Sequence, residues 1–230
     1  MKKIIFTLLA LVGTISMNAQ VMKIMKNGEV VATYTADQAD EVVFKEGITG
    51  TAKRTGDIDV NWVQLWEDGP RFAEYNVGAA KNKAEDYGGY YCWGKSADTD
   101  ANGVYKEGDS ALTGDDDTAT ALWGSNWRMP KQTEFQALLN NCDALWTTVD
   151  GVNGCKFTGR GDYKDNSIFL PAAGNCYKGS FRTLGSNGYY WSSTPDAIKT
   201  AYSLYFGSLE QRMYSLSRQY GYSVRAVLAE

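Results

Sequence analysis

The stretch Trp123-Gly124-Ser125-Asn126-Trp127-Arg128-Met129-Pro130 lies near the middle of the 230-residue chain, and we call it the tryptophan corner. It holds two tryptophans, whose large rings favour burial and whose indole N–H groups then need a hydrogen-bond partner. Gly124 stands between them and lets the backbone turn sharply. We therefore expect this stretch to form a corner of the core and to join two halves of one domain.

A helix is expected directly after the tryptophan corner. Apolar residues recur there at the spacing of one helical face, at Phe135, Leu138, Leu139 and Cys142. Thr133, with Gln136 three residues later, resembles a capping box. A shorter helix is expected at 116–122, because the run Asp115-Asp116-Asp117 places carboxylates at the positive end of a helix dipole.

The rest of the main domain has the pattern of short strands separated by turn residues. Before the tryptophan corner, strands are expected at 60–66 and 72–77. After it, strands are expected at 152–158, 167–171, 189–193, 201–206, 211–216 and 222–228. Many short strands beside few helices indicate the α+β class, with the helix on one side.

The first nineteen residues have the pattern of a cleaved signal peptide. Lys2 and Lys3 form a basic start, an apolar run follows from Ile4 to Ile15, and Ala19 supplies a small residue at the cut. The apolar run is too short to span a bilayer comfortably. We therefore expect an exported protein at the cell surface, outside the cell or in the periplasm, with no transmembrane segment in the mature chain.

The mature chain is expected to contain two parts. Residues 20–47 form a small β-hairpin module, because Asn27-Gly28 between two apolar runs is a strong hairpin signal. Residues 48–56 are rich in glycine and threonine and are expected to be a linker. Residues 57–230 then form the main domain.

Composition excludes several classes of function. Without Lys2 and Lys3 the formal charge changes from −4 to −6, and no basic cluster is present for phosphate contacts, so a nucleic-acid partner is excluded. The sequence has no histidine and no CxxC pair, so neither a zinc site nor a Cys–His nucleophile is expected.

The four cysteines leave the disulfides open. In an exported chain, Cys92, Cys142, Cys155 and Cys176 allow three pairings. Their wide and irregular spacing favours buried free thiols, with or without one bridge.

Several motifs, taken in order, resemble a known family. They are Trp123-Gly-x-x-Trp127-Arg-Met-Pro130, Phe169-Leu170-Pro171-Ala172-Ala173-Gly174, Tyr190-Trp191-Ser192-Ser193-Thr194, Ala201-Tyr202-x-Leu204-x-Phe206 and Gly221-Tyr222-Ser223-Val224-Arg225. Together they resemble the Fibrobacter succinogenes major paralogous domain, which is common in exported proteins of gut Bacteroidetes. The resemblance runs from about Asp57 to the C-terminus.

This resemblance implies a C-type-lectin-like domain, related in fold to the formylglycine-generating enzymes. It implies little about activity, although some proteins of this fold carry a ligand surface in the C-terminal part. The copper-binding cysteine pair of the formylglycine generators has no counterpart in the C-terminal strands of this sequence.

The loop Asp98-Thr99-Asp100-Ala101-Asn102-Gly103, with Asp109 at the twelfth position, has the spacing of a calcium loop. The candidate metal ligands are Asp98, Asp100, Asn102 and Asp109. Glu is the usual residue at the twelfth position, and no flanking helices are expected. A solvated acidic loop is therefore the interpretation we favour, with calcium as the alternative.

A candidate recognition surface lies between Tyr189 and Tyr220. Tyrosine and arginine are frequent anchors of such surfaces, and the proposed ligand-binding residues are Tyr189, Arg212, Tyr214, Arg218 and Tyr220. The alternative is that these tyrosines fill the core of a sheet buried on both faces. We expect a division, with Trp191, Leu204, Phe206 and Val224 inward and Tyr214, Arg218 and Tyr220 outward.

These features predict a protein that binds a protein or glycan ligand and does not catalyse a reaction. A structural component of a surface assembly is the main alternative. A carbohydrate hydrolase is a weaker one, because acidic residues are abundant and a carboxylate pair is all that such chemistry requires.

Overall fold

The computed structural model describes residues 21–26, 29–35, 48–97 and 102–229, with side chains from Ile48 onward. The chain divides into two units, Met1–Glu46 and Gly47–Glu230. In the first unit, β1 (Val21–Lys26) and β2 (Glu29–Thr35) pair antiparallel, as the hairpin prediction requires. The expected signal peptide and the Asn27-Gly28 turn lie outside the described residues.

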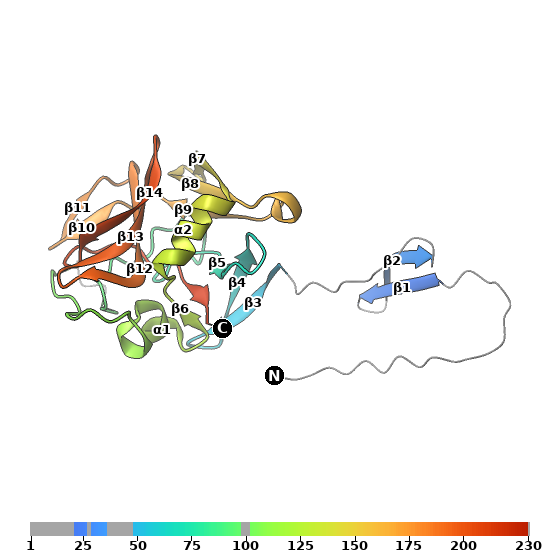
Figure 1. The fold of residues 1–230 in the computed structure, drawn as a ribbon, viewed down its shortest axis with the longest axis horizontal. Helices are drawn as coiled ribbons and strands as arrows, with labels where there is room; N and C mark the ends of the chain where they lie inside the picture. The colour runs from blue at the N-terminus through green and yellow to red at the C-terminus, as the bar shows by residue number, and fades with distance from the viewer. Residues whose placement is uncertain (1–20, 27–28, 36–47, 98–101, 230) are drawn as a thin grey trace. The chain divides into compact units, whose positions relative to one another are not determined.

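The second unit is built mostly of antiparallel sheets with few helices, which confirms the predicted α+β class at this level (Figure 1). A five-stranded sheet has the order β3 (Thr49–Arg54), β4 (Ile58–Gln64), β5 (Arg71–Ala73), β15 (Val227–Leu228) and β6 (Trp127–Arg128). Two three-stranded sheets contain β7 (Asp143–Val149), β8 (Val152–Thr158) and β9 (Ser167–Pro171), and β12 (Asn187–Ala197), β13 (Thr200–Gly207) and β14 (Gln211–Ser217). β10 (Asn175–Tyr177) and β11 (Ser180–Arg182) form a hairpin.

Both tryptophans of the tryptophan corner are buried, as predicted. The rings of Trp123 and Trp127 meet edge to face with centroids 5.5 Å apart, and the indole Nε1–H of Trp127 donates to the carbonyl of Lys53 over 3.0 Å. Arg128 then forms two hydrogen bonds, of 2.8 and 2.6 Å, with the carboxylate of Glu134. The corner thus joins the five-stranded sheet to the helix that follows.

The short helix α1 (Thr118–Trp123) begins at a buried acidic cap, after a 3-10 turn at Gly114–Asp116. The Asp117 carboxylate accepts hydrogen bonds from the backbone N–H groups of Ala119 and Thr120, each over 3.0 Å. It also accepts from the N–H of Met129. One carboxylate therefore caps the helix and holds the tryptophan corner against it. The helix was predicted at 116–122, but it begins at Thr118, and of the acidic run only Asp117 caps it.

The longer helix α2 (Gln132–Asn141) confirms the predicted helix but not its cap. The predicted capping box of Thr133 and Gln136 is wrong, because the helix already begins at Gln132. The side chain of Glu134 reaches back instead and accepts from the N–H of Lys131 over 2.6 Å. The acid three residues after the cap is the group that satisfies a free N–H at this helix start.

The segment predicted to be a linker, 48–56, contains strand β3. β3 pairs with β4 from Thr49↔Val63 to Arg54↔Ile58, and the turn between them places Gly56 and Asp57 at positive φ. Glycine and aspartate tolerate this conformation, so Gly56-Asp57 was the turn signal that marks a hairpin. The main sheet therefore begins before residue 57.

Two clusters of buried apolar side chains lie on opposite faces of the five-stranded sheet. The first core includes Ala73, Trp93, Trp127 and Trp191, and the second core includes Phe72, Phe135, Leu138, Leu204 and Phe206. Neighbouring residues of one strand, such as Phe72 and Ala73, enter different cores because strand side chains alternate between faces. Helix α2 packs across β12, β13 and β14 on the side of the second core (Figure 1).

The predicted strand at 222–228 is reduced to β15 at its end, and the strand expected at 72–77 ends at Ala73. Trp191, Leu204, Phe206 and Val224 are fully buried, as predicted. All four cysteines are buried free thiols, which is the interpretation favoured from their spacing. Every helix among the described residues is too short or too polar to cross a membrane.

Candidate functional site

Six tyrosine rings form a continuous row on the second unit, which we call the tyrosine row. In spatial order its members are Tyr214, Tyr205, Tyr189, Tyr222, Tyr220 and Tyr177. Successive ring centroids are between 5.1 and 6.2 Å apart. Interacting aromatic pairs have centroids about 4.5–7 Å apart, so each ring supports the next.

Strand register builds the first half of the row. Tyr189 on β12 lies opposite Tyr205 on β13, and Tyr205 lies opposite Arg212 on β14. Tyr214 stands two residues beyond Arg212, so it points to the same face of the sheet. Side chains at directly opposed positions are in contact range, so register alone brings these groups together.

The C-terminal segment and the β10–β11 hairpin supply the second half. Backbone bridges join Tyr222 to Tyr91 and Gly221 to Cys176. This placement brings Tyr220 against Tyr177 at the end of β10, with centroids 5.1 Å apart. Tyr222 is buried, and its ring centroid lies 4.4 Å from that of Trp191, so the row is anchored on the first core.

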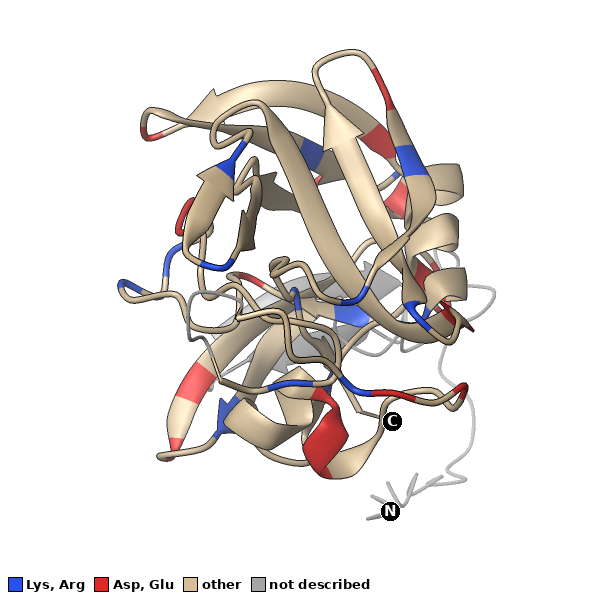
Figure 2. Ribbon diagram, turned by 90° about the vertical axis from the view of Figure 1, so that its left-hand side faces the viewer, with Lys and Arg blue, Asp and Glu red and all other residues tan. Residues whose placement is uncertain are grey.

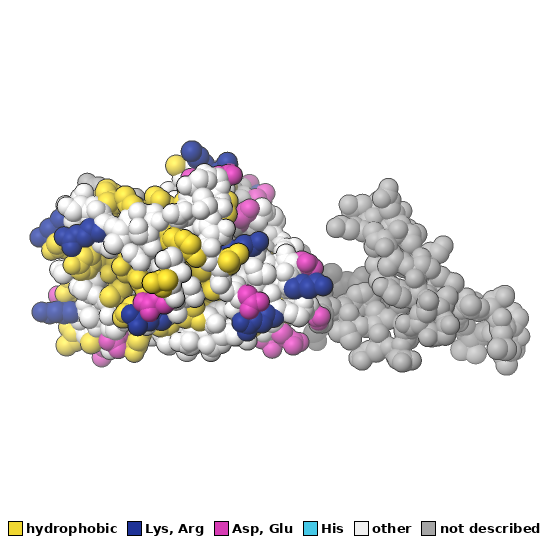
Figure 3. All heavy atoms as spheres, turned by 90° about the horizontal axis from the view of Figure 1, so that it is seen from above, with side chains coloured by type: hydrophobic (Ala, Val, Ile, Leu, Met, Phe, Trp, Pro, Cys, Tyr) yellow, Lys and Arg dark blue, Asp and Glu magenta, His cyan; other side chains and the backbone are white. Residues whose placement is uncertain are grey.

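The row is partly accessible on both sides of the buried Tyr222 and carries a cation at each end. Apart from Tyr222, its rings are half-buried. The Arg212 guanidinium lies 4.2 Å from the centroid of Tyr214, and the Lys178 ammonium lies 5.3 Å from that of Tyr177. Seen from above, hydrophobic and aromatic side chains gather over part of the second unit, with basic and acidic side chains around and among them (Figure 3).

The row offers neutral hydroxyls and ring faces. Burial raises the pKa of Tyr189 and of Tyr222 above the ordinary tyrosine value, so both phenols stay protonated at neutral pH. Asn187 donates from Nδ2 to the hydroxyl of Tyr205 over 2.9 Å. Groups of this kind provide contact area and hydrogen bonds to a ligand.

Arg218, which was predicted to face outward, is instead fully buried. Its guanidinium lies 3.9 Å from the ring centroid of Trp93 and donates to four backbone carbonyls, those of Lys106, Gly108, Ala197 and Thr200. These bonds replace water around the charge, which removes the penalty that made burial look unfavourable. Arg218 therefore holds the 106–108 loop to the β12–β13 turn and does not belong to the surface.

The other predicted ligand residues come together. Tyr189, Tyr214 and Tyr220 are members of the row, and Arg212 closes one end, with its Nη2 also 3.1 Å from the Glu210 carboxylate. Sequence reasoning did not include Tyr177, Tyr205 and Tyr222 in the site. The alternation of β13 could have found Tyr205, but no pattern links Tyr177 to residues more than forty positions away.

The candidate calcium ligands are only partly described. Asp98 and Asp100 lie outside the described residues. Asn102 uses its Oδ1 to accept from the N–H of Val104 over 2.9 Å, and Asp109 is exposed. The part of the chain that the structure describes contains no group of three His, Cys, Asp or Glu residues able to hold a metal ion. Calcium binding by this loop stays a prediction.

Along the ribbon in Figure 2, segments of lysine and arginine are interspersed with segments of acidic residues.

Residues 139–227 match the model of a family described as a domain of unknown function (DUF8237). Comparison with curated proteins and with solved structures gave no match. The matched segment contains every member of the tyrosine row, whereas the tryptophan corner lies before it.

Proposed function

We propose that this protein is an exported binding protein that recognises a protein partner through the tyrosine row. The observation that carries the proposal is a row of ring contacts in which five rings are half-buried and the central one, Tyr222, is buried, with a cation at each end. Tyrosine supplies large contact area at low conformational cost and dominates many recognition surfaces. Arginine beside it is the other residue type enriched at binding hot spots.

The row is also rigid before any partner arrives. Tyr222 and Trp191 fix its centre to the core, and hydrogen bonding by Asn187 fixes Tyr205. A surface that is already ordered loses little side-chain entropy on binding, which favours affinity. A binding role fits this arrangement better than catalysis, because the row offers neither a general base nor a nucleophile poised near neutral pH.

The proposal also includes the fold and the family that the sequence motifs resemble. We propose that the second unit has a C-type-lectin-like fold and belongs with the Fibrobacter succinogenes major paralogous domains. Its short antiparallel strands, the helix on one side and the motif order support this assignment. Export follows from the basic and apolar pattern of residues 1–19.

The test is a binding screen of the full chain against an array of extracellular protein domains. Tyr214→Ala and Tyr220→Ala should each weaken binding of a captured partner by about fivefold or more, since truncating a hot-spot tyrosine typically costs more than about 1 kcal/mol. Tyr163→Ala is the matched control, because Tyr163 is also half-buried but lies outside the row.

Thermal melting of each variant separates lost contacts from lost folding. Partner binding that survives both row substitutions would contradict the proposal. Binding to a glycan array, with the protein array blank, would assign the row to a different class of ligand.

A further inference from the structure

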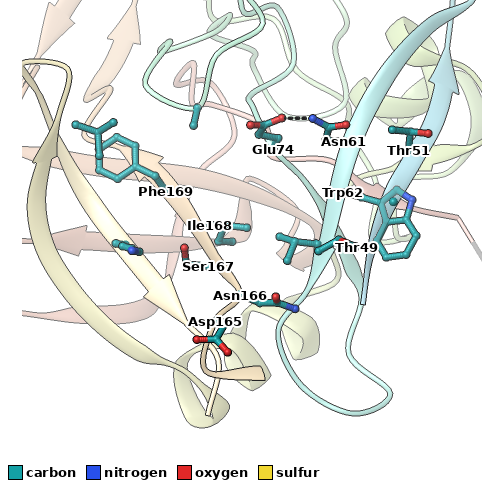
Figure 4. Close-up of a pocket in the computed structure, with 15 residues that line it drawn as sticks. Thr49, Thr51, Asn61, Trp62, Glu74, Asp165, Asn166, Ser167, Ile168 and Phe169 are labelled. Atoms are coloured by element: carbon teal, nitrogen blue, oxygen red, sulfur yellow. Dashed lines mark hydrogen bonds between the residues drawn. The ribbon is translucent and has the colours of Figure 1, made fainter. Parts of the chain in front are cut away.

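A groove separate from the tyrosine row lies between the β3–β4 hairpin and strand β9 (Figure 4). It encloses about 630 Å³, within the range of roughly 300–1,000 Å³ typical of small-ligand sites. None of its lining residues belongs to the row, so the groove is a second and independent feature of the unit.

One wall comes from the hairpin, and the other comes from the turn before β9 and the first half of that strand. Thr49, Thr51 and Asn61 line the first wall, and Asp165, Ser167 and Phe169 line the second (Figure 4). Asn61 is fixed by a 2.8 Å hydrogen bond from its Nδ2 to the carboxylate of Glu74. Thr49, Thr51, Asn61 and Ser167 are thus carried by sheet strands, whereas Asp165 lies in the turn that precedes β9 and is exposed.

A buried arginine ties the two walls together. Arg225 is fully buried and donates from Nη1 to the carbonyls of Ala73 and Glu74, over 3.0 and 2.7 Å. Its Nη2 donates to the carbonyl of Phe169 on the opposite wall over 2.9 Å. A single planar guanidinium therefore links the end of β5, beside the lining residue Glu74, to the second wall at Phe169.

Several groups in the groove have hydrogen-bonding capacity to spare. Asn166 is buried and donates from Nδ2 to the carbonyl of Gln64, and within the described residues its Oδ1 accepts no hydrogen bond. Asp165 and Lys156 both line the groove, and neither has an ion-pair partner among the residues that the structure describes. The hydroxyls of Thr49, Thr51 and Ser167 stand beside them.

We propose that this groove binds a neutral oligosaccharide. Carboxylate and amide oxygens accept hydrogen bonds from sugar hydroxyls, and the half-buried apolar side chain of Val63 contacts the C–H face of a ring. Two carboxylates, Glu74 and Asp165, outnumber the single ammonium of Lys156, which disfavours an anion. An apolar ligand would leave the polar walls unpaired, which is costly.

The experiment uses the full chain with cellotetraose, maltotetraose, mannotetraose and chitotetraose, measured by saturation-transfer NMR and calorimetry. We expect at least one of them to bind. Asp165→Ala should weaken that binding by about tenfold or more through loss of charged hydrogen bonds. Thr51→Trp should abolish it by filling the groove from an exposed strand position.

Asp115→Ala is the matched control, since Asp115 is an exposed carboxylate outside the groove, and it should bind like the parent. Tyr214→Ala should also keep sugar binding, which separates this proposal from the one for the tyrosine row. If Thr51→Trp does not fold, the Asp165→Ala variant still tests sugar binding, because the exposed side chain of Asp165 makes no contact that folding requires. Failure of all four sugars to bind, or equal binding by folded Asp165→Ala and Thr51→Trp variants, would overturn the proposal.

Discussion

Two arginines near the C-terminus are fully buried, and both are satisfied mainly by backbone carbonyl oxygens. Burial lowers the pKa of Arg225 to about 10, which still leaves the guanidinium charged at neutral pH. Residue type alone predicts an exposed position for arginine. Arg218 departs from that expectation because the fold supplies four carbonyls at the right distances, and these come from segments far apart in sequence.

Arg218→Ala should therefore destabilise the fold by about 3–5 kcal/mol, because it leaves buried carbonyls without donors and a cavity beside Trp93. Urea denaturation gives the free energy of unfolding. Arg212→Ala is the comparison, since its side chain is 50% exposed and its loss should change stability by less than about 0.5 kcal/mol. Equal effects of the two substitutions would show that the carbonyl contacts of Arg218 contribute nothing.

At the scale of elements, the contact between β12 and β13 requires a glycine, which has no side chain, at position 188. Gly188 pairs with Phe206 across the strands, and a Cβ at residue 188 would collide with the Phe206 ring. That ring packs in the second core against Phe157 and Tyr190. A well-packed core gives Phe206 no free space to move into.

Gly188→Ala should accordingly cost about 1–3 kcal/mol of stability through overpacking. Phe206→Leu in the same chain should relieve the collision, so the double variant should be more stable than the sum of the single effects predicts. The measurement is a double-mutant cycle by chemical denaturation. Strict additivity would mean that the two side chains do not compete for space.

The strands were the elements most readily predicted from sequence. Residues 152–158 and 167–171 match β8 and β9 residue for residue, because apolar runs there are bounded by turn residues. The β3 strand was missed because its threonine, glycine and lysine residues are typical of a linker. Only the pairing of Thr49 with Val63 and of Gly50 with Trp62 shows that they form a strand. The strand predicted at 222–228 was too long, because residues 221–223 form isolated β-bridges and not a continuous ladder.

At the scale of the whole molecule, the site was only half predictable. Local alternation places Arg212 and Tyr214 on one face, and the structure agrees. The contact of Tyr220 with Tyr177 and the burial of Arg218 depend on how distant segments meet, which no local pattern contains. The groove was missed for the same reason, since its walls are about a hundred residues apart in sequence.

The tyrosines also predict a pH response. Burial raises the pKa of Tyr190 and of Tyr222, so these phenols favour the folded state fully below pH about 10 and lose that contribution as the pH rises further. Phenolate absorbance should therefore rise in two steps, with accessible rings first and buried rings only on unfolding. Tyr222→Phe should shrink the second step.

The contribution of Arg225 to the free energy of unfolding changes in the opposite direction and rises with pH above about 10, because its pKa is lowered in the folded state. Phenolate absorbance, which reports tyrosine alone, is thus a better measurement here than net stability. A single reversible step for every tyrosine, with the near-ultraviolet circular dichroism of the folded protein intact, would show that Tyr190 and Tyr222 are not shielded.

The contact between Tyr222 and Trp191 gives the row an optical property. Light absorbed by the phenols passes readily to a neighbouring indole by resonance energy transfer, and the ring separations in the row are short enough for excitation to reach Trp191 from either end. The fluorescence of that indole would then change when a molecule binds to the outer rings. The protein carries its own fluorescent reporter, and a partner could be sought without attaching a dye.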